Sequence, residues 1–187
     1  MKRLLTLLAS LALVAAVHAA PETFKIDSTH SSVGFSIRHI FSKVPGAFAK
    51  FDGAITYDAA NPEASSVEAT VDVATVDTQS QKRDDHLRSK DFFTVEQFPT
   101  ASFKSTSWKK TGENTFDVTG DLTIKGTTNP TVLHVTLLGM GPGMKPGSTI
   151  SGWEAKTTIK RADFGITGFD KVLGSDVDLT INIEAGK

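Results

Sequence analysis

The sequence of 187 residues contains no cysteine. A chain without thiols has no disulfide bond, no cysteine nucleophile and no zinc–thiolate centre. It also lacks a GxSxG turn and any HExxH or HxxxH pattern, which are the usual signals of a serine hydrolase and of a helical zinc site. We therefore predict no metal site and no cofactor, and we expect stability to come from apolar burial and backbone hydrogen bonds.

A strong net charge is also absent. The chain has 20 Lys and Arg residues against 21 Asp and Glu residues, and the basic residues form no tract. A protein that binds nucleic acid usually carries a clear basic patch or stripe. We therefore expect no nucleic-acid partner.

Long apolar runs are missing except at the N-terminus. Lys2 and Arg3 precede an apolar run from Leu4 to Val17, and small residues lead from there to Pro21. This order is typical of a secretory signal peptide, and the run is too short to span a membrane. We predict that residues 1–20 are a signal peptide that is removed on export, and that residues 21–187 form one domain.

Most of the remaining chain alternates between apolar and polar residues, which is typical of strands with one buried face. Between residues 115 and 125, for example, the apolar residues Phe116, Val118, Leu122 and Ile124 alternate with threonines, aspartates and a lysine. Stretches rich in Gly, Pro, Asn and Asp separate the predicted strands, as turns require. The predicted strands cover residues 24–28, 31–41, 49–57, 67–73, 101–108, 115–125, 131–138, 153–161 and 177–184.

Many antiparallel strands and no long amphipathic helix leave a sandwich or a closed barrel as the two natural architectures. A barrel removes the exposed edges that a sandwich must protect. The interior of an eight-stranded barrel is either filled by side chains or wide enough for one slender ligand. Small residues on the apolar faces, such as Gly53 and Gly120, suit either outcome, because they leave space or relieve curvature.

The stretch RDDHLRSKDFF, residues 83–93, interrupts the strand pattern and predicts a short helix. On such a helix Asp84 and Arg88 stand four apart in the favourable order and are expected to pair. Asp84, His86 and Asp91 could also serve as the acid and base of a hydrolase or another enzyme acting on an amphipathic substrate. The same spacing fits a solvated helix surface, and the sequence offers no nucleophile beside it.

His39 lies in a predicted strand on the same face as Val33, Phe35, Ile37 and Phe41. It is either a hydrogen-bonded core histidine or a polar contact near the end of an apolar pocket. The loop GMGPGMKPGS, residues 139–148, carries two methionines and is a candidate for transient membrane contact.

Four stretches in order, HSSVGFSIRH (30–39), RDDHLRSKDFFTVEQFPTASF (83–103), GDLTIKGTTNP (120–130) and TTIKRADFGI (157–166), resemble the signature segments of the YceI-like family. The resemblance covers about Phe24 to Ile183. It implies an all-β fold, namely an extended, antiparallel, eight-stranded, lipocalin-like β-barrel with one or two short helices. It further implies a periplasmic protein whose apolar tunnel holds a polyisoprenoid, such as a polyprenyl phosphate or a ubiquinone-type lipid, and it brings no catalytic residues.

We accordingly predict a lipid-binding protein rather than an enzyme, with an isoprenoid lipid as its partner and a monomer or homodimer as its assembly. A stress-response module with an incidental ligand is a further hypothesis. The predicted wall of the tunnel consists of Phe35, Ile37, Phe51, Ile55, Val71, Val73, Phe92, Phe93, Phe98, Phe103, Leu122, Ile124, Trp153, Ile159 and Phe164. The predicted contacts to a polar head group are His39, Arg83, His86 and Arg88.

Overall fold

In a computed structural model, which describes residues 20–187, the chain forms one antiparallel sheet that closes into a barrel. The strands are β1 Glu22–Ile26, β2 Ser32–His39, β3 Ser42–Phe48, β4 Phe51–Tyr57, β5 Ser66–Asp72, β6 Val76–Asp77, β7 Thr100–Lys110, β8 Thr115–Ile124, β9 Thr127–Pro142, β10 Thr149–Lys160 and β11 Leu173–Gly186. One α-helix, α1 Gln81–Arg88, and three 3-10 turns, η1 Pro62–Ala64, η2 Val73–Thr75 and η3 Arg161–Phe164, complete the fold. The predicted signal peptide lies outside the described residues, apart from its last position.

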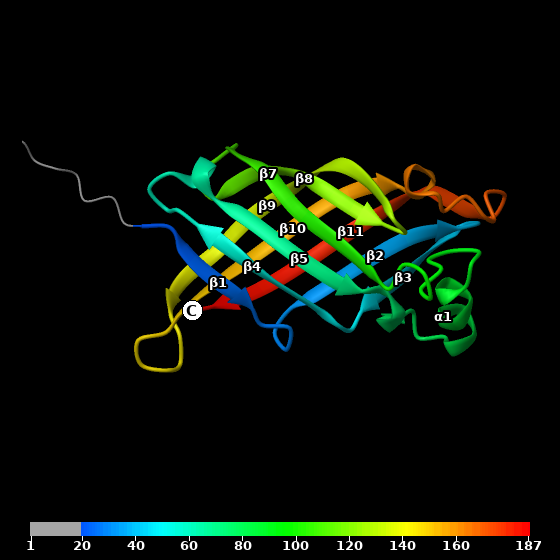
Figure 1. The fold of residues 1–187 in the computed structure, drawn as a ribbon, viewed down its shortest axis with the longest axis horizontal. Coiled ribbons are helices and arrows are strands. Elements are labelled where there is room, and N and C mark those ends of the chain that lie inside the picture. Colours follow the sequence, from blue (N-terminus) through cyan, green and yellow to red (C-terminus); the bar gives the residue numbers. More distant parts are fainter. Residues whose placement is uncertain (1–19) are drawn as a thin grey trace, which may run out of the picture.

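Eight strands form the ring in the order β1-β4-β5-β7-β8-β9-β10-β11, and pairing between β1 and β11 closes it (Figure 1). β2 pairs with the same edge of β11 that β1 uses, and β3 and β6 extend the sheet from there. The predicted eight-stranded, antiparallel β-barrel is thus confirmed. Within residues 20–187 no helix has the length and apolar character needed to cross a membrane.

The alternating sequence pattern becomes the two faces of the barrel wall. In β8, Phe116 and Val118 are buried and belong to the core, while Asp121 is exposed. The largest buried side chains of the lumen gather as an aromatic cluster of Tyr57, Trp108, Phe116 and Trp153, with ring centroids 5.1–6.4 Å apart. Aromatic pairs at these distances add to the stability that burial provides.

The segment from residue 31 to residue 48 differs from the prediction. Instead of one strand to Phe41, β2 ends at His39, and β3 begins at Ser42 after a turn of two residues, Ile40 and Phe41. Phe41 was expected on the inward face but is fully exposed in the turn. β3 was not predicted, because Pro45 and Gly46 resemble turn residues; here they lie in a strand that pairs with little more than β2.

The two ends of the barrel are built differently (Figure 1). The helix α1, the β2–β3 turn and the connection between β10 and β11 lie at one end, which we call the helix end. The β9–β10 loop and the C-terminus lie at the other, which we call the loop end.

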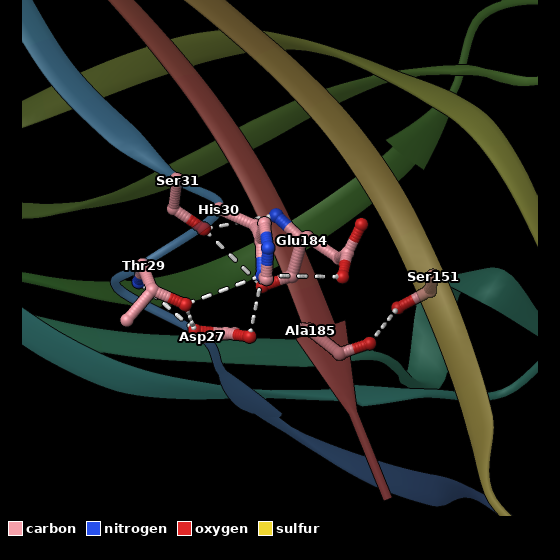
Figure 2. A network of polar contacts seen from close by, with 7 residues as sticks. All are labelled: Asp27, Thr29, His30, Ser31, Ser151, Glu184 and Ala185. Atoms are coloured by element: carbon pink, nitrogen blue, oxygen red, sulfur yellow. Dashed lines mark hydrogen bonds and ion pairs between the residues drawn. The ribbon is translucent and has the colours of Figure 1, made fainter. Parts of the chain in front are cut away.

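A polar network joins the β1–β2 connection to β11 (Figure 2). Asp27 accepts hydrogen bonds from the amide and hydroxyl of Thr29, and its second oxygen lies 2.9 Å from Nδ1 of His30. Glu184 lies 3.8 Å from the same nitrogen. The hydrogen bonds from Thr29, and next the one from His30, hold the pKa of Asp27 well below its ordinary value, while Asp27 raises the pKa of His30. Asp27, His30 and Glu184 lie close enough together to hold a metal ion, but their side chains already interact with one another.

Candidate functional site

The barrel encloses two adjoining apolar chambers. The outer chamber, of about 350 Å³, lies at the helix end, and the deep chamber, of about 170 Å³, lies within the ring. Phe48, Phe93, Ile124 and Leu179 line both, so these side chains mark the boundary. Phe93 lies edge-on to Phe48 with ring centroids 6.0 Å apart. The two volumes together reach the size of ordinary small-molecule sites.

The wall of the outer chamber is apolar except for a few groups near the helix end. Val44 and Phe48 of β3, together with Val177 and Leu179 of β11, supply typical aliphatic and aromatic surface. The polar side chains among its lining residues are His39, Thr78, Arg83, His86 and Arg161. A few polar groups in an apolar pocket are the arrangement that fixes the orientation of a bound ligand.

The carboxylate of Asp84 anchors the helix α1 against the barrel. It is buried and accepts hydrogen bonds from the amide and hydroxyl of Thr78. The predicted Asp84–Arg88 pair is therefore wrong: Arg88 instead pairs with Asp85 at 2.9 Å and donates to the carbonyls of Ala74 and Val76. Arg88 lines neither chamber, because its guanidinium is engaged with the backbone of η2 and of β6.

Arg83 and His86 both face the outer chamber from α1. Arg83 donates from Nε and Nη2 to the hydroxyl and carbonyl of Thr78. Nε2 of His86 lies 3.1 Å from Asp91, and its ring meets Phe92 and Phe169 edge-on at 5.0 and 5.2 Å. With its Nε2 held by a carboxylate and its ring packed against two phenylalanines, His86 is part of an aromatic wall.

Arg161, in η3, is a buried cation that the sequence analysis did not single out. Its side chain is buried, yet it lines the outer chamber. Its hydrogen bonds go to the carbonyls of Gly174, Ile166 and Gly168, which are neutral partners. These neutral carbonyls accept hydrogen bonds from its N–H groups but do not cancel its charge. The guanidinium therefore gives the chamber wall a positive character. In the sequence, Arg161 was marked only by its position within the family-like stretch TTIKRADFGI, residues 157–166.

The deep chamber ends at the aromatic cluster. The indole Nε1 of Trp153 donates to Ser151, but Nε1 of Trp108 is buried and has no hydrogen-bond partner among residues 20–187. An unpaired buried donor costs about 1–3 kcal/mol. Burial, and next the nearby Asp58, raise the pKa of Tyr57 in the same cluster.

The structure places most of the predicted wall around the chambers. The outer chamber is lined by Phe35, Ile37, Phe92, Phe93, Ile124, Ile159 and Phe164. The deep chamber is lined by Phe51, Ile55, Val71, Val73, Phe93, Phe103, Leu122, Ile124 and Trp153. Phe98 lines neither, because its ring packs on Gly126 in the β8–β9 turn. Phe48, Leu179 and Phe169 are lining residues that the prediction missed.

The fold and the chambers define a class: an antiparallel β-barrel with an apolar lumen that carries polar groups at one end. A model of the YceI-like domain matches residues 24–185, so this chain belongs to the YceI-like family. The UPF0312 protein of Ectopseudomonas mendocina is 42% identical over 157 residues, which cover 83% of this chain and 81% of that protein. The UPF0312 protein of Azotobacter vinelandii is 40% identical over 187 residues, covering 98% and 96% of the two chains.

Solved structures agree on the architecture. BcnA of Burkholderia cenocepacia matches with a TM-score of 0.76 at 27% identity, over 86% of this chain and 99% of BcnA. A polyisoprenoid-binding domain from Saccharophagus degradans matches with a TM-score of 0.66 over 87% of this chain and 97% of that domain. At 14% identity this second likeness concerns the fold alone.

Proposed function

We propose that this protein is a periplasmic carrier that holds one long-chain polyisoprenoid in its barrel. The observation that carries the proposal is the pair of apolar chambers in series, with polar side chains gathered at the helix end. The tail lies in the deep chamber, where apolar burial provides about 25 cal/mol per Å² before ordering costs. The choice of a polyisoprenoid as the ligand is supported by the polyisoprenoid-binding domain of Saccharophagus degradans, which shares the fold.

The head group lies in the outer chamber, close to Arg83 and Arg161. Both residues donate to main-chain oxygens and lie in an apolar wall, where they favour a ligand that accepts hydrogen bonds. A phosphate and a quinone carbonyl both meet that requirement. His39, which ends β2 and is exposed, reaches the same chamber from its rim.

Extraction of the bound ligand tests the proposal. The full chain is expressed with its N-terminal segment, purified from the periplasmic fraction, extracted into organic solvent and analysed by mass spectrometry. We expect about one isoprenoid per chain. The mass of the extracted lipid identifies its head group as a phosphate or a quinone. Extracts of wild-type protein that hold no isoprenoid, together with no binding of added isoprenoid, would refute the carrier.

The alternative of an enzyme using Asp84, His86 and Asp91 has less support. Asp84 is buried against Thr78, and His86 is held by Asp91. The carrier proposal expects His86→Ala to retain most of the ligand, because His86 contributes one edge of a large wall. Turnover of a bound lipid that is lost in His86→Ala while binding persists would favour the enzyme.

A further inference from the structure

The turn between β2 and β3 breaks the usual rules of a two-residue hairpin. Its first residue, Ile40, has φ of 50°, a conformation that such turns normally give to Gly, Asn or Asp. A β-branched residue in this region is strained, and strain of this kind clusters at functional sites. The second residue, Phe41, is 100% exposed. The turn therefore presents two large apolar side chains where a polar pair would be more stable.

A second exposed aromatic residue joins this turn to the cavity. Phe169, in the β10–β11 connection, also has a positive φ of 62° and is 48% exposed. The amide of Ile40 donates to the carbonyl of Val172 in the same connection, at 2.8 Å. The ring of Phe169 stacks on Phe92, with centroids 5.6 Å apart, and lines the outer chamber. The exposed apolar surface of the turn thus lies beside the connection whose Val172 and Phe169 line the chamber.

From this surface we infer that Ile40, Phe41 and Phe169, here called the apolar tip, dock the helix end of the barrel on a lipid bilayer. The inference rests on the proposed function, since an isoprenoid with a long tail resides in a bilayer and must enter through a surface in contact with it. The docking surface would place the outer chamber, rather than the loop end, next to the membrane (Figure 1).

The charges around the apolar tip suit a bilayer interface without requiring anionic lipid. Arg38 donates to the carbonyl of Ile40 at 2.7 Å, and Lys171 lies beside Val172, while Asp170 is the acidic residue between Lys171 and Phe169. Two cations against one aspartate leave only a small positive excess, so apolar insertion is the main driving term and anionic lipid adds a smaller attraction. Weak insertion of this kind remains reversible, which a carrier requires.

The β9–β10 loop provides the matched comparison. Met144 is as exposed as Phe41, but it lies at the loop end, and neither residue lines a chamber (Figure 1). The test compares Phe41→Ser with Met144→Ser in the full mature chain. Flotation with vesicles of phosphatidylethanolamine and phosphatidylglycerol, and separately of phosphatidylcholine alone, measures partitioning. Binding of a detergent-solubilised isoprenoid is measured in parallel.

We expect Phe41→Ser to lower vesicle partitioning about tenfold or more and to slow the uptake of isoprenoid from vesicles. Met144→Ser should match the wild-type protein, and neither change should alter the binding of solubilised isoprenoid. Equal partitioning of the wild-type and Phe41→Ser proteins, or a loss confined to Met144→Ser, would overturn the inference while leaving the carrier intact. Loss of solubilised binding in the wild-type protein would instead reject the carrier. The wild-type protein could instead form a dimer that does not partition into vesicles and that Phe41→Ser converts to a monomer. That result would overturn the inference and assign the apolar tip to self-association.

Discussion

Filling the deep chamber should separate the stability of the barrel from its capacity for ligand. Ala155 is buried in β10, lines the deep chamber and lies between Val135 of β9 and Ile181 of β11 in the sheet. Ala155→Leu places three more carbon atoms in a space of about 170 Å³. Burial of a methylene group provides about 0.8 kcal/mol, so the free energy of unfolding of the empty protein should rise by up to about 2 kcal/mol.

The same side chain occupies space that the ligand tail needs. An isoprene unit holds five carbon atoms, so excluding one unit from apolar surroundings costs about 2–4 kcal/mol, allowing for incomplete burial. This corresponds to a Kd for a long isoprenoid that is about 30- to 1000-fold higher. A short isoprenoid fits in the outer chamber alone and should bind Ala155→Leu as it binds the wild-type protein.

Fluorescence titration with solanesol and geraniol in mild detergent measures the two affinities, and urea unfolding measures stability. Trp108 and Trp153 line the deep chamber and report its occupancy. Ala47→Leu is the matched control, because Ala47 is exposed on β3 and lines neither chamber. If Ala155→Leu is folded and more stable yet binds solanesol with the affinity of the wild-type protein, then the deep chamber does not hold the tail.

Three further predictions concern individual residues. Ile40→Gly should raise the free energy of unfolding by about 0.5–1 kcal/mol, because glycine adopts the positive φ without strain; an unchanged urea midpoint would contradict the strain argument. Ser151→Ala should cost about 1–3 kcal/mol by leaving Nε1 of Trp153 unpaired, whereas Ser66→Ala at an exposed site should be nearly neutral in the same assay. His30 should titrate by NMR above its ordinary pKa of 6.5 and fall back in Asp27→Asn; its contribution to stability is complete below that pKa and is lost as the pH rises through the raised value. Folding lowers the pKa of Asp27, so the contribution of Asp27 to stability is present above about pH 4 and is lost as the pH falls below it. A His30 pKa that is not raised would refute the pair.

The strands were predictable because burial of one face leaves a period of two in the sequence. The alternation at residues 115–125 predicted β8 to within one residue of its end. β3 could not be found in this way, since Pro45 and Gly46 are ordinary turn residues and the true turn carries Ile40 and Phe41. Where a function requires apolar side chains in a turn, the local signal for that turn is lost.

The chambers were less predictable than the wall that encloses them. Small inward residues such as Gly120 left open whether the lumen has free space there, and the structure shows that a Cβ at Gly120 would lie 2.5 Å from the ring of Phe103, which fills that space. The void instead depends on how Phe48 and Phe93 meet across the lumen, a contact between residues 45 positions apart in the chain. Alternation identifies inward residues, but packing among them decides where a cavity remains.

Several costly features of the chain gather at the helix end. Ile40 and Phe169 hold strained backbones, Phe41 is exposed to water, and Arg161 is buried among neutral partners. Each feature lowers stability, and each lies at or beside the outer chamber. The loop end shows a different pattern, because its turn is rich in glycine and proline and its exposed methionines cost little backbone strain. Because backbone strain and buried charge are often kept where function offsets their cost, their concentration here supports the proposal that the barrel meets its ligand and the membrane at the helix end.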